Sequence, residues 1–346
     1  MLREWMIRMA LLTGSLLVAL LLTEVVVRVF FPIYDGRDNV TLDGKRITGW
    51  LEPGSVYRQV SNEYNALTTI TSEGYRGPKA TGPDGRPDIV FVGDSFTYGY
   101  GLEDNQTFPS IYCAERRLSC ANLGQPGSGT SRQVKRLEQL IERWQWRPRE
   151  VKLFFFGMST SFSAGNDFVD NYNYGRWLRQ QRQKAAGYGP APAAASVSSD
   201  VGVVERAIAS QKSLLAHSTL MRHVKFHWGP LLKSMVLADP GERMTEALEY
   251  TEQGLQELDA LSRRAGFSYR VYLLVPVHDV IRGTYDETLA TLNSVSPKPA
   301  IATARIFADA PQDYYYAFDG HFNPKGSRRL AEYLVSLEHA SSSVQQ

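Results

Sequence analysis

The chain has 346 residues, of which 43% are hydrophobic and 21% charged, which is enough for one large globular domain with appendages. Its 38 basic and 36 acidic residues leave a formal net charge of +2. This balance argues against a nucleic-acid partner, because such proteins normally carry a clustered basic surface.

The N-terminal segment is long and apolar enough to cross a membrane. Residues 9–23 carry no charge, and valines and phenylalanines extend the apolar stretch to residue 31. A spanning helix needs about 20 such residues. Glu24 and Arg28 interrupt the stretch, but their i,i+4 spacing with the acid first favours an ion pair. We therefore expect a membrane helix rather than a buried core helix.

The charges before this helix predict its orientation. Arg3 and Arg8 precede the uncharged run, so the positive-inside rule puts the N-terminus in the cytoplasm. No small-x-small cleavage site follows the run, so we expect residues 1–31 to be an uncleaved anchor rather than a removed signal peptide. The prediction is a single-pass protein of the inner (cytoplasmic) membrane with an extracytoplasmic, periplasmic domain.

The only two cysteines lie close together in the sequence, at Cys113 and Cys120. In an oxidising compartment they can form a disulfide between the end of a helix and the start of the next strand. Two separate buried thiols are the alternative. No second Cys or His pair accompanies them, so their spacing does not predict a metal site.

The rest of the chain divides by composition and periodicity. Residues 32–87, rich in Gly, Pro, Asp and Thr, are interpreted as a spacer with short strands. A main domain is expected over 88–338, with an insertion at about 175–240 and a polar tail at 339–346. Its alternating strands and helices predict a parallel sheet with helices on both faces. The expected strands are 56–60 and 67–71 in the spacer and 88–92, 121–123, 151–156 and 269–275 in the domain; the expected helices are 107–118, one opening at 131, 244–265 and 324–337.

A serine and a histidine stand out as a potential catalytic pair. Ser95 ends the tripeptide Gly93-Asp94-Ser95, directly after the apolar strand, and ligand sites in open α/β sheets lie at the carboxyl ends of strands. His321 lies just before the last helix, with Asp319 two residues earlier. A serine hydroxyl is a poor nucleophile until a base accepts its proton, and an aspartate fixes the imidazole tautomer.

Two further positions can supply donors to a developing oxyanion. Gly127 lies in a glycine-rich turn after the second domain strand, where a backbone N–H can approach a ligand closely. Asn166 follows the third domain strand and can aim a side-chain N–H at the same point. Together with the N–H of Ser95 they form a candidate oxyanion hole.

In this order, Gly93-Asp94-Ser95, Gly127, Asn166 and His321 resemble blocks I, II, III and V of the SGNH (GDSL) hydrolases, over about residues 88–337. The resemblance implies a three-layer α/β/α flavodoxin-like fold and esterase, lipase, deacetylase or acyltransferase activity, with no cofactor or metal. It also implies that Ser95 is the nucleophile and His321 the base, and that Gly127 and Asn166 are oxyanion donors.

The chain departs from the family pattern at the acid. The usual block V reads D-x-x-H, and Phe318 occupies the acid's position here. Some membrane-associated members that act on polysaccharide esters have D-x-H instead, which matches Asp319 and His321. We therefore expect Asp319 to be the acid of the triad. A Ser–His dyad, or a backbone carbonyl in place of the acid, is the alternative.

Other histidines offer competing interpretations. His278 and Asp279 follow a predicted strand, so His278 could be the general base instead of His321, with Asp279 as its acid. His217, His223 and His227 could form a metal cluster if the insertion folds around them, although neighbouring basic residues favour a basic amphipathic surface.

The sequence therefore favours a membrane-anchored serine esterase or O-acyltransferase that works through an acyl-enzyme. Its expected partners are the membrane, through the N-terminal helix, and an ester-bearing small molecule or glycan, with an O-acetylated cell-envelope glycan as the favoured substrate. One alternative is a lipid or thioester hydrolase, which a broad apolar groove under the insertion would favour. Another is a non-catalytic glycan-binding or assembly protein, which a misplaced His321 or a blocked cleft would favour.

Overall fold

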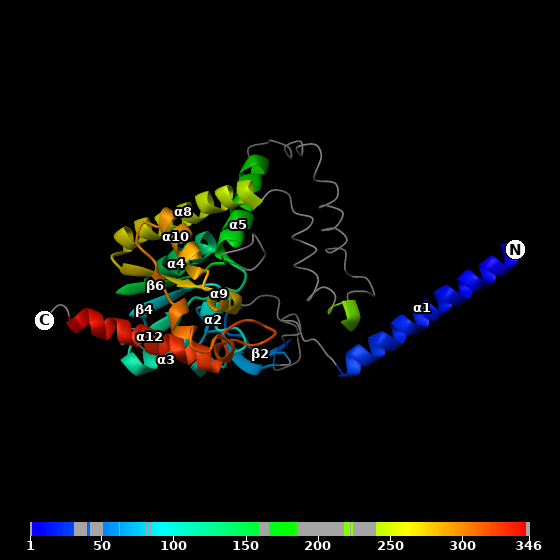
Figure 1. The fold of residues 1–346 in the computed structure, drawn as a ribbon. Coiled ribbons are helices and arrows are strands. Elements are labelled where there is room, and N and C mark those ends of the chain that lie inside the picture. The colour runs from blue at the N-terminus through cyan, green and yellow to red at the C-terminus, as the bar shows by residue number, and fades with distance from the viewer. Residues whose placement is uncertain are drawn as a thin grey trace. The chain divides into compact units, whose positions relative to one another are not determined.

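The computed structural model describes residues 2–30, 40–41, 51–61, 63–80, 82, 85–158, 166–185, 218–221, 223 and 240–343. The chain divides into two units, which are described separately below (Figure 1). The first unit is Met1–Asp35 with Tyr188–Ala238, and the second is Gly36–Gly187 with Asp239–Gln346.

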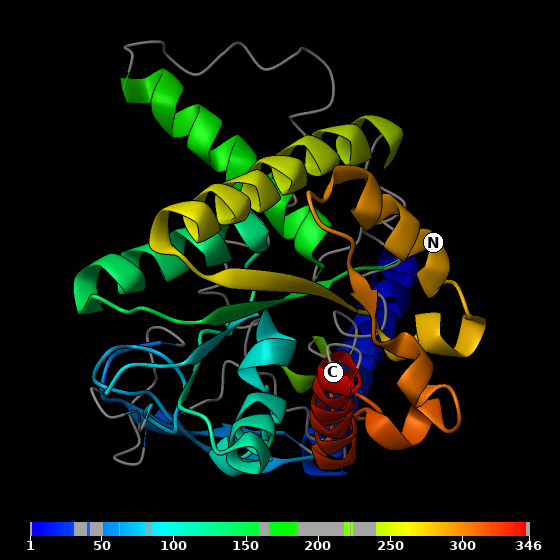
Figure 2. The same ribbon diagram turned by 90° about the vertical axis from the view of Figure 1, so that its left-hand side faces the viewer.

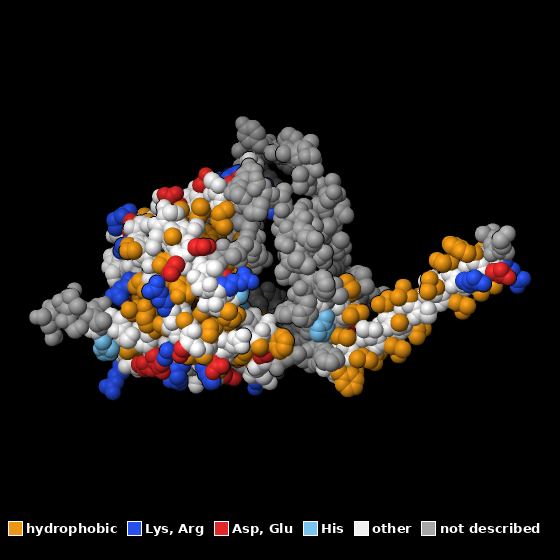
Figure 3. Space-filling view, in the orientation of Figure 1, with side chains coloured by type: hydrophobic (Ala, Val, Ile, Leu, Met, Phe, Trp, Pro, Cys, Tyr) orange, Lys and Arg blue, Asp and Glu red, His pale blue; other side chains and the backbone are white. Residues whose placement is uncertain are grey.

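The first unit contains α1 (Leu2–Phe30). Within its segment Arg3–Phe30 an 18-residue window has a mean hydropathy of 2.3, so the helix is long and apolar enough to span a membrane, a test that a signal sequence also passes. Figure 3 shows hydrophobic side chains along the helix and charged side chains at its N-terminal end. The expected ion pair between Glu24 and Arg28 is present at 3.0 Å. Glu24 also accepts a hydrogen bond from Ser218 Oγ at 2.7 Å.

The second unit begins with a small antiparallel sheet in the order β1-β2-β3. Its strands are β1 (Val40–Thr41), β2 (Val56–Val60) and β3 (Asn65–Thr69). The last two pair in register, with Val60 opposite Asn65, so the short strands expected in the spacer form a hairpin. Buried and exposed side chains alternate along β2, which leaves one face of the hairpin packed against the domain.

A five-stranded parallel sheet follows, in the order β5-β4-β6-β7-β8. In chain order this is 2-1-3-4-5, the flavodoxin-like topology. Figure 2 shows α4, α5 and α8 over one face and α3 and α12 over the other. The predicted three-layer α/β/α fold is therefore confirmed. The elements are β4 (Ile89–Gly93), α2 (Ser95–Tyr98), η2 (Asp104–Gln106), α3 (Phe108–Arg116), β5 (Cys120–Asn122), α4 (Thr130–Trp144), β6 (Glu150–Phe156), α5 (Asp167–Ala185), α8 (Pro240–Ala265), β7 (Ser268–Leu274), α9 (Val277–Arg282), α10 (Tyr285–Val295), β8 (Ile301–Ala302), η4 (Ala304–Phe307), α11 (Pro311–Tyr314) and α12 (Pro324–Ser343).

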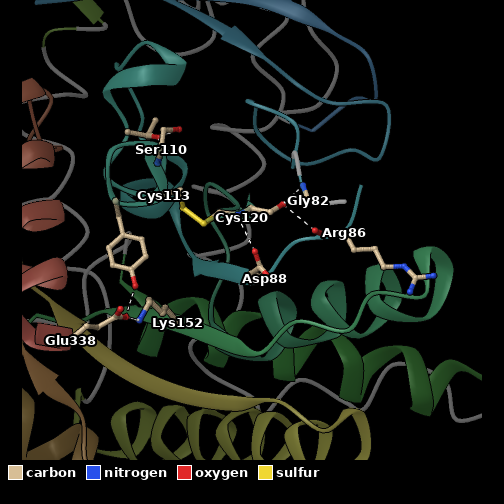
Figure 4. Close-up of a disulfide and its surroundings, with 11 residues drawn as sticks. Gly82, Arg86, Asp88, Ser110, Cys113, Cys120, Lys152 and Glu338 are labelled. Carbon is tan, nitrogen blue, oxygen red and sulfur yellow. Dashed lines mark hydrogen bonds and ion pairs between the residues drawn. A yellow bond between two sulfur atoms is a disulfide. The ribbon is translucent and has the colours of Figure 1, made fainter. Parts of the chain in front are cut away.

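The central strands are apolar because both of their faces are covered, and β4 is buried throughout. The exception is Lys152 in β6, which is fully buried. Its Nζ donates to Glu150 at 3.0 Å and to Glu338 of α12 at 2.8 Å, the latter visible in Figure 4. A buried charge is tolerated only when it is paired, so this network fixes α12 against the sheet. The same helix begins directly after the segment that carries His321.

The structure contains a disulfide between Cys113 of α3 and Cys120 at the start of β5 (Figure 4). It joins the end of a helix to the next strand and closes a short loop. This loop lies at the amino end of β5, at the opposite end of that strand from the glycine-rich turn.

Two parts of the fold differ from the prediction or go beyond it. The helix α5 runs to Ala185, so regular structure continues past residue 175, where the insertion was placed. The segment between β7 and α12 holds the short strand β8 and four helices, α9, α10, η4 and α11, which no strong periodicity in the sequence predicts. Most of the predicted insertion at about 175–240, including His217 and His227, lies outside the described residues.

Candidate active site

Ser95 is placed by a sharp turn at the end of β4. It is the first residue of α2, and Asp94 caps that helix by accepting a hydrogen bond from Phe96 N at 2.9 Å. A Cβ on Gly93 would lie 2.1 Å from Thr97 Oγ1 and 2.8 Å from Phe154 O, so only glycine permits this turn. Because Asp94 is the cap, the Ser95 side chain is not needed for that role and stays half-buried at the carboxyl end of the strand.

Three predicted side chains form one hydrogen-bonded chain. His321 Nε2 lies 2.7 Å from Ser95 Oγ, and His321 Nδ1 lies 2.5 Å from Asp319 Oδ1. Both distances are within reach for proton transfer and for orientation of the imidazole. The ring of Phe318, at the family's usual acid position, is 69% exposed. The structure therefore brings Asp319, and not position 318, to the histidine.

Aromatic rings enclose the histidine. The ring centroid of His321 lies 4.7 Å from that of Phe96 and 5.0 Å from that of Tyr100. Its carbonyl accepts a hydrogen bond from Tyr316 N at 2.8 Å. The His321 side chain is only 20% exposed. The two aromatic rings therefore fix its imidazole, and the hydrogen bond from Tyr316 N fixes its backbone.

The electrostatics favour an ionised acid next to a basic imidazole. Burial by itself lowers the pKa of His321, but the charge and hydrogen bond of Asp319, together with the charge of Asp94, raise that pKa above the ordinary 6.5. Burial raises the pKa of Asp319, but His321 and a hydrogen bond from Tyr64 outweigh it and lower that pKa. Asp319 can therefore stabilise an imidazolium.

The glycine-rich turn is tied to the end of β4. Gln125 N donates to Gly93 O at 2.8 Å, two residues before Ser95. A Cβ on Gly124 would lie 2.0 Å from Tyr98 N, so glycine is required for this close passage. Gly127 adopts a φ of +66°, and within the described part of the chain its N–H donates to no acceptor. That N–H is therefore available to a ligand.

Asn166 begins the helix that follows β6 and is 2% exposed. Its Oδ1 accepts a hydrogen bond from Val169 N at 3.1 Å, which caps α5 and fixes the orientation of the amide. Ser95, Gly127 and Asn166 thus follow β4, β5 and β6. These strands are neighbours in the sheet, so the three candidate oxyanion donors lie at the same edge.

The pKa values of three buried carboxyl groups, at the turn that carries Ser95 and at the start of α5, are raised. Burial raises the pKa of Asp94 to about 7, although the charge of His321 opposes the shift. Burial also raises the pKa of Asp170 to about 6, and burial with repulsion from Asp94 and Asp170 raises the pKa of Asp167. Among the described residues, no group of three or more His, Cys, Asp or Glu side chains is placed to hold a metal ion.

His278, the rival base, is not bonded to Ser95 in the part of the chain that the structure describes. His278 lies on α9 with its Nε2 3.5 Å from Asp279 Oδ1, whereas Ser95 bonds to His321. Of the three insertion histidines, only His223 is described.

Three residues that the sequence did not reveal support the site. Arg76 is fully buried and donates to Tyr98 O at 3.0 Å and to Gly99 O at 2.7 Å, which fixes the chain after α2. Glu63 and Tyr64 contact the segment that carries Asp319. All three come from the segment interpreted as a spacer, where no motif marks them.

No protein-family model matches the chain, and no curated protein matches it. Solved structures that are similar include a protein from Desulfitobacterium hafniense described as a lipolytic protein of the G-D-S-L family, with 11% identity, a TM-score of 0.37, and coverage of 71% of this chain and 96% of that one. An acetylxylan esterase from Geobacillus stearothermophilus has 12% identity and a TM-score of 0.36, with coverage of 75% and 94%. A carbohydrate esterase of family 2 from Corynascus thermopiles has 12% identity and a TM-score of 0.38, with coverage of 80% and 72%.

These neighbours are described as a G-D-S-L lipolytic protein and carbohydrate esterases. Because their TM-scores lie below 0.5, the assignment of function rests on the motifs and on the geometry of the site.

Proposed function

We propose that this protein is a serine ester hydrolase of the SGNH type, with Ser95 as nucleophile, His321 as general base and Asp319 as the acid of the triad. The observation that carries the proposal is the continuous chain from Ser95 Oγ through the two ring nitrogens of His321 to Asp319 Oδ1, at 2.7 and 2.5 Å. The proposal is also supported by the positions of Ser95, Gly127 and Asn166, which follow three neighbouring parallel strands.

His321 accepts and returns a proton twice in the reaction. Ser95 Oγ attacks the ester carbonyl carbon while His321 Nε2 takes the hydroxyl proton. The oxyanion receives hydrogen bonds from Ser95 N, Gly127 N and Asn166 Nδ2. The bond to the leaving alcohol breaks as the alcohol takes the proton from His321, which leaves an acyl-enzyme. Water, or the hydroxyl of an acceptor, then attacks the acyl carbon and gives its proton to His321. The bond between the acyl carbon and Ser95 Oγ breaks as His321 returns that proton to Oγ, and the free acid or the acylated acceptor leaves.

The membrane helix suggests where this chemistry takes place. We propose that α1 anchors the protein in the inner membrane with the catalytic unit outside the cytoplasm, in line with Arg3 and Arg8 before the apolar run. In that compartment an O-acetylated cell-envelope glycan is the favoured substrate. Transfer to a sugar hydroxyl and hydrolysis by water share the same acyl-enzyme.

Covalent labelling tests the proposal. The full-length protein in detergent is expected to react with a fluorophosphonate probe, and peptide mapping is expected to place the adduct on Ser95. p-Nitrophenyl esters of increasing chain length then test the acyl group, with acetyl preferred over long chains. A preference for long chains would favour the lipid hydrolase, and an unlabelled protein with no esterase activity would favour the non-catalytic alternative.

The raised pKa of His321 predicts the pH dependence of the reaction. The base must be neutral to accept the serine proton, so kcat/KM is expected to rise with pH and to reach half its maximum above pH 6.5, the ordinary value for imidazole. A pH profile with p-nitrophenyl acetate measures this midpoint. A midpoint below 6.5 would mean that Asp319 does not stabilise the imidazolium.

The oxyanion role of Asn166 can be separated from its helix cap. Asn166→Asp keeps an oxygen that accepts from Val169 N but removes the amide donor, so kcat is expected to fall by roughly 10²–10³-fold in a variant that keeps the cap of α5. Asn166→Ala loses both functions, and its melting temperature should fall because a lost cap costs about 1 kcal/mol. Unchanged kcat in a folded Asn166→Asp variant would exclude the residue from the oxyanion hole.

A further inference from the structure

The turn of the β2–β3 hairpin is built around one serine. Ser61 N donates to Tyr64 O at 2.9 Å. Ser61 Oγ accepts from Glu63 N at 3.0 Å and from Tyr64 N at 3.3 Å. These bonds hold the turn, so the Glu63 and Tyr64 side chains leave it in defined directions.

Glu63 binds the backbone of the segment that carries the acid. Its carboxylate accepts hydrogen bonds from Ala317 N at 2.6 Å, Phe318 N at 3.1 Å and Asp319 N at 2.8 Å. Bonds from N–H groups to a carboxylate are stronger than those between neutral groups. Three successive N–H groups are thus satisfied by one side chain, which fixes the backbone up to two residues before His321.

Tyr64 binds the acid itself. Its hydroxyl donates to Asp319 Oδ2 at 2.8 Å, while Oδ1 of the same carboxylate faces His321. Each carboxylate oxygen therefore has its own partner, which fixes the rotation of the carboxylate. Burial first, and then the charge of Asp319, raise the pKa of Tyr64 far above the ordinary 10, so the hydroxyl remains a donor throughout an assay range.

Aromatic packing fixes the tyrosine ring. Its centroid lies 5.0 Å from that of Tyr316 and 6.0 Å from that of Tyr100. A Cβ on Gly101 would lie 2.7 Å from Tyr64 Cδ1, so the chain passes directly against the ring. Tyr100 also contacts the His321 ring, so the tyrosine that orients the acid and the ring that encloses the base belong to one cluster.

We propose that Glu63 and Tyr64 are positioning residues for the Asp319–His321 pair, Glu63 through the backbone of 317–319 and Tyr64 through the carboxylate. This inference rests on the proposed function. It makes the segment before the parallel sheet part of the active site rather than a spacer.

Tyr64→Phe in the full-length protein tests this role. The variant keeps the ring and loses only the hydroxyl on Asp319. We expect kcat for p-nitrophenyl acetate to fall by about tenfold, the size of one lost hydrogen bond to a charged group, with KM unchanged. The negative charge of Asp319 then concentrates on the oxygen that faces His321, so the acid limb of the pH profile should move to higher pH.

Tyr316→Phe is the matched control, because it removes a hydroxyl from the same cluster that donates to Gly101 O at 2.9 Å and not to Asp319. The acid limb of the pH profile of Tyr316→Phe should stay at the pH of the wild type. An unmoved limb in a folded Tyr64→Phe protein, or an equal shift in both variants, would overturn the proposal.

Glu63 is tested by a graded pair of variants. Glu63→Gln keeps one oxygen that can accept from the backbone, whereas Glu63→Ala keeps none. We expect kcat to fall further in Glu63→Ala than in Glu63→Gln, with labelling of Ser95 slowed in the same order. Equal kcat in the two variants and the wild type would exclude Glu63.

A readout that needs no turnover separates this inference from the proposed function. The downfield imidazole N–H proton resonance of His321, assigned by its loss in His321→Gln, should titrate at higher pH in Tyr64→Phe than in the wild type. If the wild type neither hydrolyses esters nor reacts with the probe, the proposed function fails. The titration still decides whether Tyr64 acts on the Asp319–His321 pair.

Discussion

Ser95→Ala is expected to reduce kcat for p-nitrophenyl acetate by on the order of 10⁴-fold or more and to abolish fluorophosphonate labelling. The reason is geometric: Ser95 Oγ is the hydroxyl that lies 2.7 Å from His321 Nε2, so its loss leaves the base with no nucleophile. The fold should survive, because Asp94 and not Ser95 caps α2. Steady-state kinetics and gel-based detection of the probe measure the two effects.

The matched control for this substitution is Ser262→Ala on α8, a buried serine whose hydroxyl donates to Asp259 O at 2.8 Å. It makes the same chemical change outside the site and should keep both activity and labelling. Labelling that persists in Ser95→Ala would refute the assignment of the nucleophile, whatever the activity of the control.

Asp319→Asn is expected to lower kcat by roughly 10³–10⁴-fold, because the imidazolium formed in the reaction loses its negative partner and the imidazole tautomer is no longer fixed. Asp319 Oδ1 lies within hydrogen-bond distance of His321 Nδ1, so the substitution acts on the direct partner of the imidazole. The measurement is kcat/KM as a function of pH, in which the acid limb should also move to lower pH, because the charge that raises the pKa of His321 is gone.

This experiment also decides between a triad and a Ser–His dyad. A dyad predicts a fall of less than about tenfold, comparable to the loss of a single hydrogen bond. Asp313→Asn serves as the control, since Asp313 is an exposed acid near the same segment and pairs with Lys325 at the surface. Equal small effects in both variants would exclude Asp319 as the acid.

The sheet was predictable because its signals are local. The sequence alone shows apolar runs at β4, β6 and β7 and helical periodicity at α4, α8 and α12. The observed ends of these elements differ from the predicted ends by a few residues. The candidate residues were also predictable, because Ser95, Gly127 and Asn166 each follow a strand. Parallel topology then requires the ends of neighbouring strands to meet.

The residues that hold the site in place from other parts of the chain were not predictable in this way. Glu63 and Tyr64 lie more than 250 positions from the residues that they bind, in a segment with weak strand signals. Lys152 interrupts an apolar strand, and only the fold reveals Glu338 beside it. Such pairs depend on which helix covers which face, and that is a property of packing rather than of local pattern.

The amino-acid sequence by itself determined the fold class, the apolar N-terminal helix and the residues able to form a nucleophile, a base and an oxyanion hole. These follow from short-range periodicity and from motifs at the ends of strands. Only the tertiary structure decided that the carboxylate of Asp319 faces His321, because the direction of that side chain depends on the turn whose backbone Glu63 binds. It also decided that the segment before the parallel sheet contacts the acid, since hydrogen bonds between distant residues form only when the chain has folded.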